Sequence, residues 1–153
     1  MRLQLLAIAL SSIVSAASIA ARPPAPEPDL PWAFQGPRGD GYRIELLDVT
    51  PAPGTPLPAG VDVTFGVRVR YSLDVASHGL VMMVIEDENN QLVTDDEEDQ
   101  ASQGVERGDG EVTLTGSIVV PGDARELRVF VPLIPDGLET PEGEITLRYP
   151  VTR

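Results

Sequence analysis

The most constraining feature of this sequence is a stretch, residues 61–71, in which apolar side chains occupy every second position. These apolar residues are Val61, Val63, Phe65, Val67, Val69 and Tyr71. A period of two is the period of a β-strand that buries one face and leaves the other in water. Such a strand cannot be stable alone, so this stretch predicts a sheet with one apolar face.

Four other parts of the chain support the same fold class. The alternation returns at residues 112–120, 127–133 and 145–151. A first strand is expected at 42–49, and a change of parity at Leu47 predicts a bulge or a crossing between sheets. One-faced strands of this kind are typical of antiparallel sheets. The sequence therefore predicts an all-β fold, a single antiparallel β-sandwich of about seven strands.

The segments between these strands are expected to be turns, loops or strands with another burial pattern. Residues 72–79 are a weak stretch, and the apolar run 80–85 predicts a central strand covered on both faces. Residues 88–91 can form a hairpin turn because asparagine tolerates positive φ, with a short returning strand at 91–94. Residues 95–110 contain almost no apolar side chains, which predicts a long loop.

The first part of the chain has the layout of an export signal. Residues 1–20 combine a basic start at Arg2, an apolar middle and small residues at the end, which is typical of a secretory signal peptide. Residues 21–41 include a proline-rich stretch that predicts an extended spacer, and residues 42–153 form the predicted domain. We expect a periplasmic or secreted protein that is not inserted in the membrane after signal cleavage.

The strand number, the strand spacing and the Pro-Gly-rich connection at 51–60 resemble those of immunoglobulin-like and fibronectin type III-like sandwiches of exported bacterial proteins. The resemblance covers Tyr42 to Val151 and concerns architecture only. The chain has no cysteine pair, and its single tryptophan, Trp32, precedes the first core strand. The resemblance implies a binding or spacing role rather than a particular activity.

Charge and residue types exclude several classes of function. The formal net charge of −13 disfavours nucleic acid as a partner, because phosphate backbones would be repelled. His78 is the only histidine, and no G-x-S-x-G motif is present. We therefore predict that the chain is not an enzyme, and a secreted hydrolase is the weakest of the alternatives.

Two aromatic residues precede the first core strand. Trp32 and Phe34 lie two positions apart and would share one face of an extended segment. One interpretation is a short strand that packs both rings against the sandwich. The other is an anchor for a partner protein, because aromatic residues dominate binding energy at interfaces.

The acidic run at 95–99 is the candidate metal site. If the run is extended, Asp95, Glu97 and Asp99 share one face and could ligate a calcium ion, the only cofactor that the sequence suggests. The alternative is a solvated loop of mutually repelling carboxylates.

These observations lead to one main hypothesis about function. We expect an exported, non-catalytic binding, subunit or spacer module whose partner is another exported or envelope protein. It would act through a sheet edge, through Trp32 and Phe34, or through the acidic 95–110 loop. The alternative is a calcium-binding, calcium-stabilised extracellular module.

Overall fold

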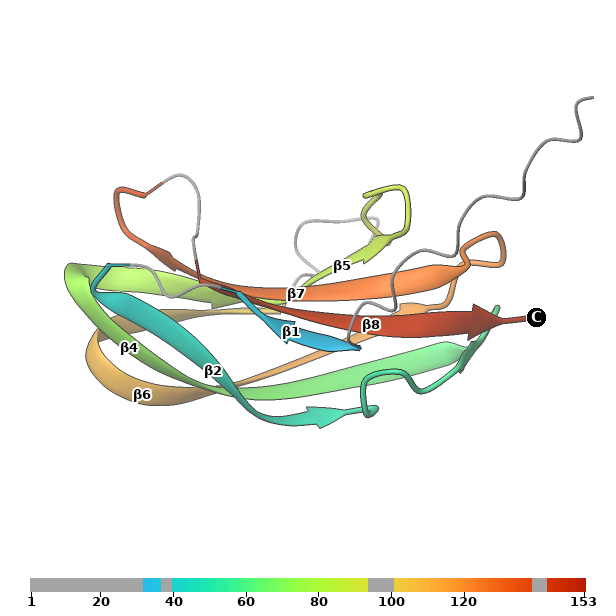
Figure 1. The fold of residues 1–153 in the computed structure, drawn as a ribbon, viewed down its shortest axis with the longest axis horizontal. Helices are drawn as coiled ribbons and strands as arrows, with labels where there is room; N and C mark the ends of the chain where they lie inside the picture. The colour runs from blue at the N-terminus through green and yellow to red at the C-terminus, as the bar shows by residue number, and fades with distance from the viewer. Residues whose placement is uncertain (1–31, 37–39, 94–100, 139–142) are drawn as a thin grey trace, which may run out of the picture.

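All regular elements in the described part of the chain are β-strands (Figure 1). The computed structural model describes residues 32–36, 40–93, 101–138 and 143–153. The strands are β1 (Ala33–Gln35), β2 (Tyr42–Thr50), β3 (Leu57–Pro58), β4 (Asp62–Met82), β5 (Val84–Asp87), β6 (Ser102–Val119), β7 (Glu126–Pro135) and β8 (Glu144–Thr152). None of the described segments forms a helix of the length and apolarity that crossing a bilayer requires.

The strands form two layers that face each other, as Figure 1 shows. One layer has the order β1-β8-β7-β5 and the other has the order β2-β4-β6, with antiparallel neighbours throughout. The layers are joined where the end of β4 pairs with the end of β7, from Gly79↔Pro135 to Val81↔Leu133. Only the short β3 runs parallel to its neighbour, β8. The predicted all-β antiparallel fold is confirmed, with eight strands among the described residues.

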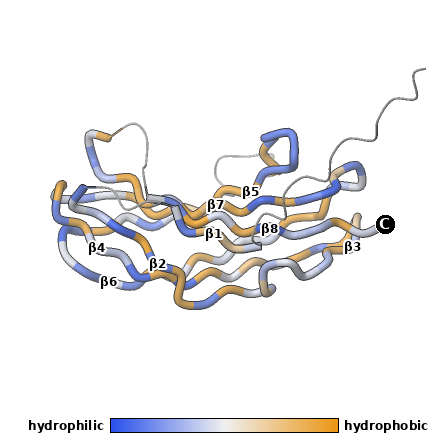
Figure 2. Tube along the Cα trace, viewed as in Figure 1, coloured by the Kyte–Doolittle hydropathy of each residue, from blue (hydrophilic) through white to orange (hydrophobic). Residues whose placement is uncertain are grey.

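The core lies between the two layers. It follows the alternation of hydrophobic and hydrophilic residues along the strands, which Figure 2 shows by colour. In β4 the side chains of Phe65, Val67 and Val69 are buried, whereas Arg68 and Arg70 between and beyond them are exposed. The other layer contributes inward residues from β7 and β8, namely Leu127, Val129, Val131, Leu133, Ile145, Leu147 and Tyr149. Burying each large aliphatic or aromatic side chain contributes about 1.5–3 kcal/mol, so this core is the main source of stability.

Two local expectations can be compared with the strand register. The bulge predicted in the first strand is present, because the pairing of β2 with β4 shifts between Leu46 and Asp48. Val61, expected to point inward, is instead exposed, because it lies before the first residue of β4 at the end of the sheet.

The structure corrects the expected boundaries in three places. β4 continues through residues 72–79, which were expected to be a weak stretch. The predicted loop at 95–110 is wrong for residues 102–110, which belong to β6 and pair with β4. Both errors have one cause: the ladder is made by backbone groups, so a strand whose side chains mostly face water needs few apolar residues.

The run 80–85 is the third correction, because it is divided between two strands. β4 ends at Met82 and β5 begins at Val84 in the other layer. The predicted returning strand at 91–94 is reduced to a single bridge, Glu86↔Leu92, in its described part.

Candidate functional site

Phe34 lies on the short β1 at the edge of the β1-β8-β7-β5 layer, and Trp32 immediately precedes this strand. β1 pairs with β8 from Ala33↔Leu147 to Gln35↔Ile145, and the backbone N–H of Arg148 donates to the Trp32 carbonyl at 2.8 Å. Leu147 is buried, so Phe34, which lies opposite Thr146, has its side chain on the outer face. Trp32 is 48% exposed and Phe34 is 52% exposed.

Trp32 also has a contact within the molecule. A Cβ atom built on Gly54 would lie 2.9 Å from Cγ of the indole, so the ring packs directly against this glycine. Gly54 has φ of +82° and its N–H donates to the Arg148 carbonyl at 2.8 Å. The turn at Gly54 therefore orients the indole, while nearly half of the side chain still meets solvent.

The strand register places further side chains beside Phe34 on the outer face of the same layer. Phe34 lies opposite Thr146, Thr146 lies opposite Phe130, and Phe130 lies opposite Val84. Directly paired residues share one face of a sheet, so these four side chains form a row across β1, β8, β7 and β5. We call this row the outer aromatic row. Phe130 was missed in the sequence, although an aromatic ring at an outward position between Val129 and Val131 is a detectable signal.

Two arginines beside the outer aromatic row have partners within the sheet. Arg148 forms a two-pronged ion pair with Glu126, with Nε–Oε1 at 2.9 Å and Nη2–Oε2 at 2.6 Å. Arg128, directly opposite Arg148, donates from Nη2 to the Asp87 carbonyl at 2.9 Å. Its Nε is buried and has no hydrogen-bond partner among the described residues. The two arginines therefore place positive charge on the outer face of a strongly acidic protein.

Two carboxylates of the 86–88 segment, those of Asp87 and Glu88, accept hydrogen bonds from backbone N–H groups. Asp87 accepts from the backbone N–H groups of Gln91 and Asn89, at 2.9 and 2.8 Å, and these bonds lower the pKa of Asp87 below its ordinary value. Glu88 accepts from the Arg125 N–H at 3.0 Å, which lowers the pKa of Glu88 in the same way. The expected positive φ of an asparagine in this turn is found at Asn90.

The predicted calcium ligands Asp95, Glu97 and Asp99 lie outside the described residues. Within the ranges that the structure describes, no group of three or more histidine, aspartate or glutamate side chains is arranged to hold a metal ion.

A second candidate site, which the sequence did not predict, lies where β2 begins, β4 bulges and β7 ends. Between Leu73 and His78 the pairing of β4 with β6 is interrupted, and Val75 is left 48% exposed in the bulge. After β7, the Asp136 N–H donates to the His78 carbonyl at 3.0 Å, and this contact holds the following turn, with Leu138 45% exposed, beside the bulge. The resulting hollow has a volume of about 340 Å³.

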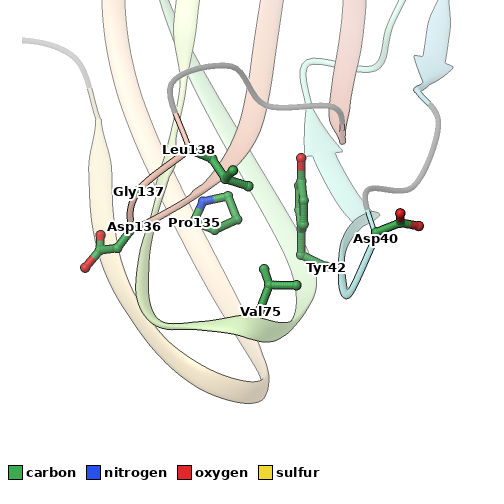
Figure 3. Close-up of a pocket in the computed structure, with 7 residues that line it drawn as sticks. All are labelled: Asp40, Tyr42, Val75, Pro135, Asp136, Gly137 and Leu138. Carbon is green, nitrogen blue, oxygen red and sulfur yellow. The ribbon is translucent and has the colours of Figure 1, made fainter.

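We call this hollow the end pocket, and Figure 3 shows its side chains. Its lining residues are Asp40, Tyr42, Val75, Pro135, Asp136, Gly137 and Leu138. Tyr42, Val75, Pro135 and Leu138 gather around the hollow. The carboxylates of Asp40 and Asp136 lie on opposite sides of it and point away from its centre. The pocket thus has an apolar interior and an acidic rim.

Gly41 is required where the chain enters this pocket. Its φ is +78°, its carbonyl accepts from the Asp74 N–H at 2.7 Å, and an added Cβ would collide with Cγ1 of Val75. Replacing Gly41 with alanine should destabilise the fold by about 1.5–2 kcal/mol, from left-handed backbone strain and this collision. Urea unfolding measures the change.

Gly60 provides the matched control for this substitution. Its φ is +75°, but an added Cβ meets nothing within 4 Å. Gly60→Ala should therefore show only the backbone strain, roughly 1 kcal/mol. Equal losses in the two variants would show that the contact between Gly41 and Val75 contributes nothing.

Comparison with known proteins adds no family to this description, since no family model matches the chain and no curated relative is found.

Proposed function

We propose that this chain is an exported, non-catalytic binding module, a subunit or spacer, that contacts another exported or envelope protein through Trp32 and the outer aromatic row. The observation that carries the proposal is the half-exposed pair Trp32 and Phe34, held on a paired strand and continued by Phe130. Rigid, exposed aromatic side chains supply much of the binding energy at protein interfaces.

The polar surroundings support the same proposal. The ion pair of Arg148 with Glu126 and the hydrogen bond of Arg128 to the Asp87 carbonyl place polar groups around the rings. Interfaces of this composition, with an aromatic centre and a polar rim, are common in complexes that form and dissociate. The proposal includes a periplasmic or secreted location and an immunoglobulin-like or fibronectin type III-like kinship.

β6 offers a second contact mode for the same function. In the described residues it pairs only with β4, so one edge of Ser102–Val119 has no neighbouring strand. Glu106, Arg107, Asp109 and Glu111 place charges along one half of this edge, a common protection against unwanted pairing. The half from Thr113 to Val119 carries no charge and is the part to which an extended partner segment would add.

Removing both exposed rings tests the proposed contact surface. The variant Trp32→Ala/Phe34→Ala should recover its partner from the exported fraction with an affinity reduced at least about tenfold, because each ring is a candidate hot spot. Quantitative pull-down with increasing bait concentration measures the change.

The matched control is Val61→Ala, which removes an exposed apolar side chain from the opposite layer and lies outside the β6 edge. This control should bind as the unmodified chain does. If the aromatic variant also binds as the unmodified chain does, Trp32 and Phe34 are not the contact surface and the proposal fails.

A further inference from the structure

The end pocket combines two features that recognise one kind of side chain. Its interior is formed by the ring of Tyr42 and by three apolar side chains, of which Val75 and Leu138 are about half exposed. A hollow lined by apolar side chains and bordered by a few polar groups is the common form of a small binding site. The volume of about 340 Å³ is near the lower end of the range for ligand pockets, so the occupant is small.

The rim of the end pocket carries negative charge that no described residue neutralises. Asp40 and Asp136 are exposed and lie on opposite sides of the hollow. Among the described residues, neither carboxylate takes part in a hydrogen bond or an ion pair, and no basic side chain lines the pocket. The two exposed carboxylates place negative charge on both sides of the apolar interior.

We propose that the end pocket binds the side chain of an arginine or lysine presented by a partner protein. These side chains bury an apolar stem and keep a cationic head in water, which matches an apolar interior with an acidic rim. The formal net charge of −13 also favours the approach of a cationic partner segment. This inference uses none of the residues of the outer aromatic row and is independent of the function proposed above.

The probe is a short, terminally blocked glycine-serine peptide with one central arginine, titrated into the ¹⁵N-labelled chain and followed by NMR. The backbone amide signals of Gly41, Val75 and Gly137 should shift and saturate with a dissociation constant of about 1 to 10 mM, as expected for a single side chain. A lysine peptide should shift the same signals.

Two control peptides separate the charge from the apolar stem. Citrulline keeps the shape of arginine without its charge, and norleucine keeps only an apolar chain. Both should bind at least about two- to fivefold more weakly than the arginine peptide, which is the range expected for loss of exposed ion pairing. If both controls bind as tightly as arginine, or if the arginine peptide shifts no signal of the pocket, the inference is overturned.

Variants of the protein test whether the two carboxylates of the end pocket contribute to arginine binding. Asp40→Asn/Asp136→Asn keeps the shape of the rim and should weaken arginine binding by about two- to fivefold for each lost carboxylate. Trp32→Ala/Phe34→Ala should bind the arginine peptide unchanged. If this aromatic variant loses the peptide while the asparagine variant keeps it, the peptide binds on the outer aromatic row and the end pocket is not its site.

Discussion

Replacing Phe65 with alanine should lower the free energy of unfolding by about 3–5 kcal/mol. Phe65 is fully buried near the start of β4, and its ring meets the ring of Tyr149 edge to face at 5.2 Å between centroids. This contact joins the two layers, so the substitution leaves a cavity where β4 and β8 face each other. A loss of this size is a large share of the roughly 5–15 kcal/mol that stabilises a typical domain.

The same substitution at an exposed phenylalanine is the matched control. Phe34→Ala removes the same atoms from a ring that is 52% exposed, so its effect on stability should stay within about 0.5 kcal/mol. Urea unfolding followed by circular dichroism measures both variants. Similar losses at the two positions would contradict the assignment of Phe65 to the core between the layers.

Replacing Tyr149 with phenylalanine should cost about 1–3 kcal/mol at neutral pH. The Tyr149 hydroxyl donates to the Pro51 carbonyl at 3.0 Å, although its ring is completely buried. The substitution keeps the ring and its contact with Phe65, so the loss reports on the hydrogen bond that ties β8 to the turn after β2. An unchanged free energy of unfolding would show that water replaces this bond without cost.

Tyr149 should also make the stability of the chain depend on pH above about 10. Burial raises the pKa of Tyr149 above its ordinary value, while in the unfolded chain the pKa of tyrosine is about 10. Above that pH the unfolded state loses the phenol proton and the folded state keeps it. The resulting stabilisation of the protonated folded state is complete below about pH 10, and stability then falls by up to ~1.4 kcal/mol per pH unit as the pH rises.

A comparison of the Tyr149→Phe variant with the unmodified chain isolates the contribution of the Tyr149 phenol. Free energies of unfolding measured in urea between neutral pH and about pH 11 should fall less steeply above pH 10 in Tyr149→Phe than in the unmodified chain. Identical slopes would show that Tyr149 is ionised as easily in the folded state as in the unfolded state.

The parts of the fold that could be predicted are those in which side-chain chemistry reports on burial. Phe65, Val67 and Val69 alternate with residues that meet water, and the register of the sheet follows that alternation. The change of parity at Leu47 also indicated the bulge in β2 correctly. The pairing of residues 102–110 with β4 could not be predicted in this way. Their polar side chains show no burial pattern, and the pairing is made by backbone hydrogen bonds.

The candidate sites could be predicted only in part, for a related reason. Trp32 and Phe34 were identifiable from residue type and spacing, but the row that Phe34 forms with Phe130 depends on the pairing of β1, β8 and β7. The end pocket could not be predicted from the sequence, because Val75 is exposed only where β4 bulges against the start of β2.

The sequence by itself therefore determined the all-β class of this protein, the inward face of its main strands and its strongly acidic character. The alternation of apolar residues is a local property of each strand, and net charge is a sum over all residues. Both can be determined from the sequence without knowing which strands are neighbours. The tertiary structure alone decided which distant residues share a surface. The outer aromatic row and the end pocket depend on strand register and on a bulge, and these are set by the packing of the two layers against each other.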